Sequence, residues 1–118
     1  MGISQEEELE DIAADLSFRV AQLYHFLNNE LGQEDLAFLI QHALTLVGEL
    51  SFYNKLLADK CRSEDSIATA KEVLRALARA VIITQTEDPG AEQILEADAF
   101  IIQAQATLYN KARQCLGL

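Results

Sequence analysis

The chain has 118 residues, of which 50% are hydrophobic and 24% charged, with five Gly, one Pro, two Cys and no Trp. This length suits one domain, and the apolar share supports a hydrophobic core, which excludes wholesale disorder, a collagen-like chain and a disulfide-rich scaffold. The net charge of −10 disfavours general nucleic-acid binding and binding to anionic membranes, because both need a basic surface. A basic protein is the partner that this charge favours.

The first predicted helix covers residues 5–31. Ser4 and Glu7 form the S-x-x-E pattern of a capping box, in which a hydroxyl and a carboxylate bond free amide groups reciprocally. Gly32 follows at the place where a left-handed residue commonly ends a helix. Apolar residues recur every three or four positions, which predicts one buried stripe, made of Leu9, Ile12, Leu16, Val20, Leu23, Leu27 and Leu31.

The second predicted helix covers residues 34–61, and it is apolar over more than half of its circumference. Its longest unbroken apolar run, 36–40, is far shorter than the ~20 residues of a membrane-spanning helix. Gly48 lies in its middle, where Gly costs ~1 kcal/mol relative to Ala, so we expect a close helix approach there. The predicted core stripe is Leu36, Ile40, Ala43, Val47, Leu50, Leu57 and Cys61.

Two more helices are predicted over 64–85 and 90–115. Ser63 or Ser66 is expected to cap the third helix, and Asp88 the fourth, with Pro89 in its first turn. Short connections favour antiparallel neighbours, and no segment alternates as a strand would. We therefore predict an all-α protein, a single-domain antiparallel four-helix bundle over residues 1–118 with up-down-up-down topology. The later stripes are Ile67, Ala70, Leu74, Leu77 and Val81, then Ile94, Ile101, Leu108, Ala112 and Cys115, with Leu95, Ile102 and Tyr109 alongside.

A second face of the helix over 34–61 is the strongest candidate for partner binding. An apolar cluster broken by polar residues is typical of an interaction patch. The alternatives at this point are a homodimer contact, a contact with a different protein, and deeper burial within the bundle. The predicted partner-binding residues are Phe38, His42, Leu46, Glu49 and Tyr53.

Six acidic residues near the start of the chain form a second candidate surface. They suit a helix N-terminus and solvation, and the functional alternative is that they form a docking surface for a basic partner. Lys71, Arg75 and Arg79 form a basic row, for which pairing with acids of the same chain is the simpler expectation. The predicted acidic docking residues are Glu6, Glu7, Glu8, Glu10, Asp11 and Asp15.

The two cysteines, Cys61 and Cys115, have no CxxC spacing that would indicate a zinc site or a redox pair. The N-terminal residues show no basic and apolar regions of a secretion signal. We therefore expect a reduced, cytoplasmic protein, with one disulfide as the alternative that geometry must decide.

No catalytic, cofactor or metal motif is found: neither histidine has Glu three residues before it, as the Glu-x-x-His pairs of bundle di-metal sites require. We therefore predict a protein that is not an enzyme and needs no metal or other cofactor. The predicted function is a small acidic interaction module: an adaptor, chaperone, immunity protein or inhibitor.

His42 supports an alternative function. The acidity, size and predicted bundle resemble those of histidine-phosphotransfer domains, whose exposed mid-helix His belongs to an H-x-x-K-G pattern. His42 lies off the core stripe, while Thr45 and Leu46 stand where that pattern has Lys and Gly. The resemblance implies a signalling domain that is phosphorylated on His42.

A third alternative is a helical nuclease. Arg19 and His25 form an R-x5-H spacing, which resembles the R-x4-6-H motif of the HEPN ribonucleases. The match covers two residues of one helix, and Arg19 is placed to pair with Asp15 four residues earlier. We do not carry the ribonuclease activity over to this chain.

Overall fold

Four helices make up the part of the chain that the computed structural model describes, residues 4–29, 34–86 and 88–118, with side chains at 4–25, 36–86 and 88–118. Their bounds are α1 Gln5–Asn29, α2 Glu34–Asp59, α3 Glu64–Gln85 and α4 Ala91–Leu116. The predicted all-α four-helix bundle is confirmed. Gly32 and the predicted end of the first helix at residue 31 lie outside the described residues, as do the side chains of Leu27 and Leu31.

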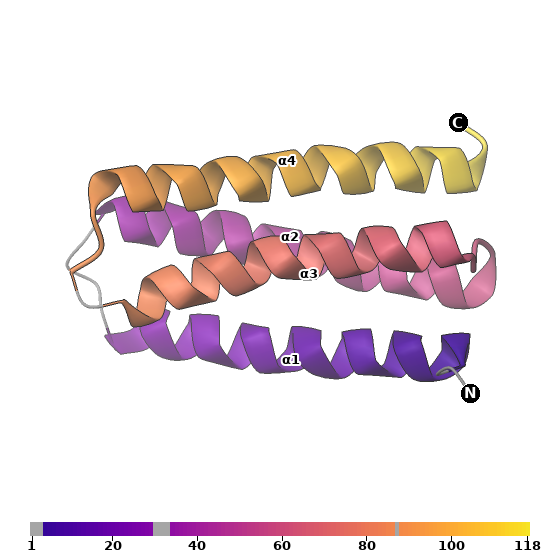
Figure 1. Cartoon of the computed structure of the whole chain (residues 1–118), viewed down its shortest axis with the longest axis horizontal. Coiled ribbons are helices and arrows are strands. Elements are labelled where there is room, and N and C mark those ends of the chain that lie inside the picture. The colour runs from indigo at the N-terminus through magenta and orange to yellow at the C-terminus, as the bar shows by residue number, and fades with distance from the viewer. Residues whose placement is uncertain (1–3, 30–33, 87) are drawn as a thin grey trace.

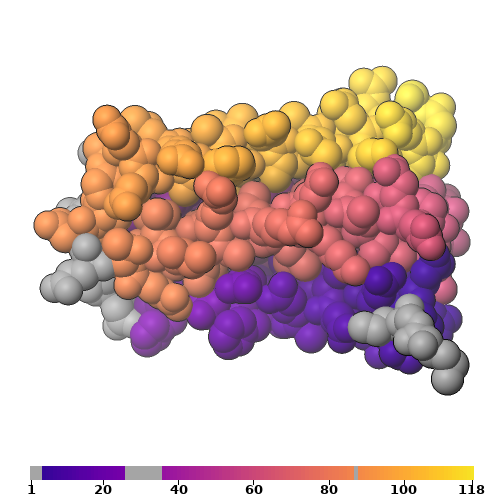
Figure 2. All heavy atoms as spheres, in the orientation of Figure 1, coloured from indigo at the N-terminus to yellow at the C-terminus, as the bar shows by residue number. Residues whose placement is uncertain are grey.

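The helices are arranged with α2 and α3 in the centre (Figure 1). Both α1 and α4 pack against α2 and α3, and the two central helices also touch each other. Within the described residues α1 and α4 make no contact. Successive helices run in opposite directions, so α2 and α4 are parallel neighbours whose C-terminal ends lie at the same end of the bundle. Figure 2 shows the face on which α3 lies between α1 and α4.

This arrangement explains why α2 is apolar on more than one face. A helix at the edge of a bundle needs one apolar stripe, whereas α2 contacts all three other helices. Of the three alternatives for its second face, burial within the bundle therefore accounts for much of the pattern. Its buried residues are Leu36, Leu39, Ile40, Ala43, Leu46, Leu50, Tyr53 and Leu57.

The predicted core stripes agree well with the burial. Every predicted stripe residue of α3 is buried, from Ile67 to Val81, and so are Ile94, Ile101 and Leu108 of α4. Val47 and Ala112 pack against this core while remaining partly exposed. The three- and four-residue spacing therefore identified the buried side of these helices.

The helix starts follow local hydrogen bonding. The Glu7 backbone N–H donates to Ser4 Oγ at 3.2 Å, and the Ser66 N–H donates to Ser63 Oγ at 3.1 Å, as predicted for these caps. The prediction for α4 is wrong: its N-cap is Gly90, whose N–H donates to Gln93 Oε1 at 3.0 Å. Asp88 instead has a φ of 53°, a left-handed conformation that Asp tolerates better than most residues, so it belongs to the turn before the helix.

By length and composition alone, one described helix could cross a membrane, from Leu36 to Asp59. The central helix of a water-exposed bundle passes the same test, because apolar residues cover several of its sides.

Candidate protein-interaction face

Two polar pairs set the register of α2 against α4. His42 Nδ1 lies 2.6 Å from Asp98 Oδ1, and Gln105 Nε2 donates to Glu49 Oε1 at 2.8 Å. Both pairs join residues 56 positions apart in the sequence. Each residue of α2 is therefore level with the residue of α4 about 56 positions later, along two parallel helices.

These pairs divide the partner-binding residues that the sequence predicted. Leu46 and Tyr53 are buried in the core, so the expectation that they lie on an open partner surface is wrong. His42 and Glu49 face α4 through the polar pairs, and both remain partly exposed. Phe38 alone of the five is exposed. The cause is the central position of α2, which turns most of its second face toward α4.

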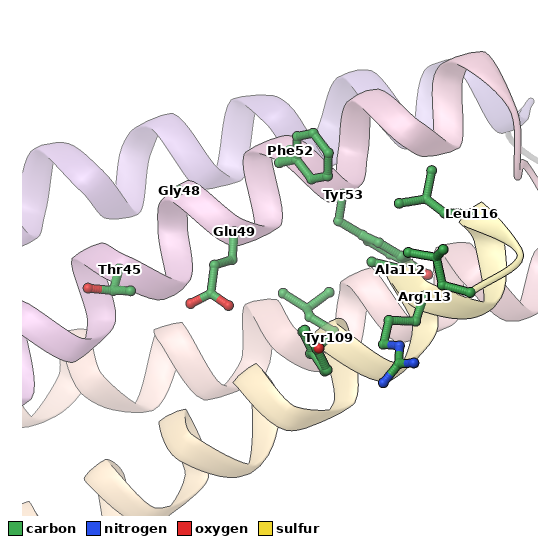
Figure 3. A pocket seen from close by; sticks show the side chains of 11 residues that line it. Thr45, Gly48, Glu49, Phe52, Tyr53, Tyr109, Ala112, Arg113 and Leu116 are labelled. Atoms are coloured by element: carbon green, nitrogen blue, oxygen red, sulfur yellow. The ribbon is translucent and has the colours of Figure 1, made fainter.

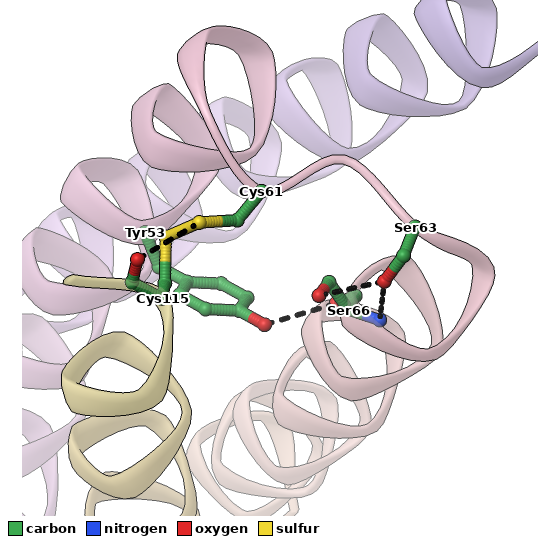
Figure 4. Close-up of a disulfide and its surroundings, with 5 residues drawn as sticks. All are labelled: Tyr53, Cys61, Ser63, Ser66 and Cys115. Carbon is green, nitrogen blue, oxygen red and sulfur yellow. Dashed lines mark hydrogen bonds between the residues drawn. A yellow bond between two sulfur atoms is a disulfide. The ribbon is translucent and has the colours of Figure 1, made fainter. Parts of the chain in front are cut away.

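Tyr53 is held by a hydrogen bond across the bundle. Its hydroxyl donates to the carbonyl oxygen of Ser66 on α3 at 3.2 Å (Figure 4). Burial raises the pKa of the Tyr53 hydroxyl above its usual value, because the charged phenolate would lose its hydration. The buried ring and this hydrogen bond therefore indicate that Tyr53 stabilises the bundle.

Exposed apolar side chains flank the polar pairs on their solvent side. Six large side chains lie there, and each is between 43% and 68% exposed. The 56-residue offset puts Phe38 close to the level of Leu95, and Phe52 close to the level of Tyr109. We call this surface the α2–α4 face, and it consists of Phe38 and Phe52 from α2 with Leu95, Ile102, Tyr109 and Leu116 from α4.

Sequence reasoning found only Phe38 of these six as a partner-binding residue. The sequence contained a signal for three of the others, because Leu95, Ile102 and Tyr109 recur every seven residues beside the core stripe of α4. A second apolar row on a helix can be buried or open. Only the packing shows that this row is open.

A groove of about 760 Å³ opens within the face between α2 and α4 (Figure 3). Phe52 and Tyr109 stand on its two sides, Glu49 and Arg113 add charges of opposite sign, and Gly48 lies along it. A Cβ added to Gly48 would meet no atom within 4 Å. The expected close helix approach is therefore wrong, and the missing side chain leaves the groove open instead.

A disulfide lies at the C-terminal ends of α2 and α4, between Cys61 and Cys115 (Figure 4). The expectation of two reduced thiols is wrong for this structure, and the alternative of one disulfide applies. The disulfide can form because the two helices run parallel. This brings the two Cα atoms to 5.8 Å, within the range that a disulfide spans. The cytoplasmic location stays a prediction, and a thiol count on protein from intact cells tests it.

The acidic cluster on α1 is partly paired within the molecule. Glu6 lies 3.6 Å from Arg62, Glu8 2.9 Å from Lys71, and Asp15 3.2 Å from Arg19. The other three acids, Glu7, Glu10 and Asp11, form no ion pair within the described residues and are exposed. The predicted acidic docking surface is therefore reduced to those three side chains.

Arg79 and Arg19, two further candidate residues, are held by ordinary surface contacts. Arg79 pairs with Glu96 at 3.3 Å and lies over the Phe100 ring, with its guanidinium carbon 4.1 Å from the centroid. The expected pairing of Arg19 with Asp15 is confirmed. Among the described residues, no group of three or more His, Cys, Asp or Glu side chains could hold a metal ion.

Comparisons with known proteins add no assignment to this geometry. The sequence matches no protein-family model, no curated protein and no solved structure.

Proposed function

We propose that this chain is a small acidic, non-enzymatic interaction module that binds a protein partner through the α2–α4 face. The observation that carries the proposal is the set of six exposed apolar side chains gathered on one side of a chain with a net charge of −10. Large apolar patches with polar groups among them are typical of protein-binding surfaces. Adaptors, chaperones, immunity proteins and inhibitors share this way of working.

The polar groups on the face favour binding of an apolar segment. The pairs His42–Asp98 and Glu49–Gln105 are hydrogen-bonded within the chain, so each carboxylate keeps a hydrogen-bond partner when the face is covered. The groove between Phe52 and Tyr109 offers a place for an apolar side chain of the partner. The three unpaired acids on α1 would steer a basic partner toward the molecule, an effect that salt weakens.

A matched pair of variants tests this proposal. Phe52→Ser with Tyr109→Ser removes one Phe and one Tyr from the α2–α4 face, where they are 56% and 62% exposed. Phe18→Ser with Tyr24→Ser removes the same residue types from α1, where they are 59% and 50% exposed. Tagged chains are used to capture partners from extracts of the source cells.

We expect the first double variant to lose the captured protein and the second to keep it, with unchanged helicity by circular dichroism in both. Equal capture by the two double variants would show that the α2–α4 face is not the binding surface.

A second candidate function rests on the contact between His42 and Asp98. When Nδ1–H donates to the carboxylate 2.6 Å away, the neutral ring keeps its lone pair on Nε2, the atom that would attack a phosphoryl group. The His42 side chain is 43% exposed. This is the geometry that phosphotransfer through His42 would use, with an acyl phosphate losing its phosphoryl group and leaving as a carboxylate.

Mass spectrometry after incubation with acetyl phosphate tests this alternative. An acid-labile phosphate on His42, absent in His42→Gln, would support it. Chains that stay unmodified under conditions that phosphorylate a known phosphotransfer domain would exclude it.

A further inference from the structure

Helix α4 carries an apolar row with the spacing of a coiled-coil seam on its exposed side. Intervals of four and three residues alternate along the row, which is the heptad pattern. Large apolar residues occupy one heptad position, and the other position holds two alanines in the middle of the row with Glu92 and Arg113 near its two ends. All eight side chains are exposed: Glu92, Leu95, Ala99, Ile102, Ala106, Tyr109, Arg113 and Leu116. We call this row the α4 seam.

We propose that the α4 seam is a homodimer interface, in which α4 packs antiparallel against α4 of a second copy. This inference rests on the proposed function, because it names the partner of the α2–α4 face. The six large side chains of that face expose roughly 500 Å² of apolar surface in total. That area is a large part of the ~800 Å² that each partner buries in a stable interface.

The alternation of large and small residues fits an antiparallel pair. In that arrangement the two heptad positions face each other, so Ile102 meets Ala106 of the second copy, and Tyr109 meets Ala99 of the second copy. Each central layer then holds one large and one small side chain, which fills the space evenly. A parallel pair would set Tyr109 against Tyr109 and Ala106 against Ala106, with crowding in one layer and a void in the next.

The charges along α4 favour the same direction. The first half of the helix carries Glu92, Glu96 and Asp98, while the second half carries Lys111 and Arg113. Glu96, Asp98 and Lys111 contact Arg79, His42 and Asp65 of the same chain. Antiparallel packing therefore brings Glu92 of one copy toward Arg113 of the other, and parallel packing sets each of the two against its own counterpart.

The two charged residues of the α4 seam, Glu92 and Arg113, are placed to form an ion pair between the two copies. With Ile102 facing Ala106, Arg113 lies beside Leu95 and within reach of Glu92 of the second copy. Within the described residues Glu92 forms no ion pair, whereas Glu96 already pairs with Arg79. The Arg113 guanidinium carbon lies 5.6 Å from the centroid of its own Tyr109 ring, which keeps the charge on the seam. A chain of net charge −10 thus has a seam whose charges complement a second copy.

Sedimentation equilibrium of the full chain, with its disulfide intact, tests the proposal. We expect a concentration-dependent mass that reaches twice 13.1 kDa. Ile102→Asp should raise the dimer dissociation constant about a hundredfold or more, because it sets an unpaired charge in the centre of the interface. The matched control is Ile82→Asp on α3, since Ile82 is 59% exposed and Ile102 is 53% exposed. The control should leave the constant unchanged.

Charge exchange tests the antiparallel direction. Arg113→Glu and Glu92→Arg should each raise the dissociation constant about fivefold or more, because each sets like charges together. The double variant should restore the wild-type constant, since the two exchanged charges again face charges of opposite sign on the second copy. In a parallel dimer each residue would face its own counterpart, so like charges would face each other in the wild type and in every variant, and the single exchanges would leave the constant nearly unchanged.

The outcomes separate this proposal from the proposed function. A wild-type chain that remains at 13.1 kDa at every concentration overturns the homodimer, and so does a dimer that Ile102→Asp leaves intact. If such a chain still captures another protein through Phe52 and Tyr109, the proposed function stands with a different partner. If it captures none through those residues, both proposals fail.

Discussion

Helix α4 presents two apolar seams that resemble each other in sequence and differ in environment. The buried seam, Ile94, Ala97, Ile101, Ala104 and Leu108, packs against α2 and α3. The α4 seam has a similar alternation of large residues and alanines, and all of it is exposed. Residue type and spacing thus show that a surface is suited to helix packing. Whether the chain itself supplies the packing helix depends on the tertiary structure.

The largest expected effect comes from two adjacent isoleucines, one in each seam. Ile101 is fully buried and Ile102 is 53% exposed. Ile101→Ala should lower the free energy of unfolding by about 2–5 kcal/mol, through lost burial and the cavity left behind. Ile102→Ala should change it by less than about 1 kcal/mol. Urea unfolding at protein concentrations low enough to keep the chain monomeric measures both changes. Equal losses of stability would show that the two seams do not differ in burial within one chain.

The disulfide secures the end of α4 that both seams share. It joins residues 54 positions apart in the sequence, so its loss should lower the free energy of unfolding by about 2–4 kcal/mol, since the unfolded chain regains entropy. Cys61→Ala with Cys115→Ala, compared with the wild type with and without reductant, measures this loss. If the reductant destabilises the double variant as much as the wild type, the effect does not come from this disulfide.

Gly48 gives a smaller effect of the opposite sign, on the groove side of α2. Gly48→Ala should raise the free energy of unfolding by about 0.5–1 kcal/mol, because Ala restricts the unfolded chain and favours the helix. No atom lies within 4 Å of the added Cβ, so the gain should not be offset by a clash. Urea unfolding gives the value, and a loss of stability would mean that the helices approach more closely at Gly48 than described.

The smallest effect concerns Tyr53, the buried tyrosine, in comparison with the exposed Tyr24 and Tyr109. Burial raises the pKa of Tyr53 in the folded state. Its contribution to stability is therefore complete below the usual tyrosine pKa near 10, and it is lost as the pH rises through the raised folded-state pKa. Absorbance at 295 nm should show one late-titrating tyrosine that Tyr53→Phe removes. A variant that keeps the late step would assign it to another residue.

The sequence predicted the fold because the fold depends on local rules. Spacings of three and four residues located the buried side of each helix, and Ser4 and Ser63 marked helix starts through the hydrogen bonds that they accept. Asp88 was misjudged as a cap, because Asp also suits the left-handed turn that precedes Gly90. Asp is therefore compatible with both positions by sequence alone, and the path of the chain decides which of the two it occupies.

The candidate site was only partly predictable, because it depends on which helices are neighbours. Nothing within α2 distinguishes Leu46, which is buried, from Phe52, which is exposed, until α4 is placed beside α2. The same placement joins His42 to Asp98 and brings Cys61 to Cys115. Each of these contacts links residues more than 50 positions apart, whereas helix periodicity describes neighbours three and four positions apart.

The sequence by itself therefore determined four helices, their buried stripes, most of their starts, and a net charge of −10. The tertiary structure decided that α2 is central, that its second face meets α4, that the two cysteines are joined, and that the α4 seam is open. The physical reason is that backbone hydrogen bonding and amphipathic spacing are local, whereas the burial of a second apolar face depends on the finite number of helices available to cover it. Within the described residues, three helices surround α2, and only two contact α4.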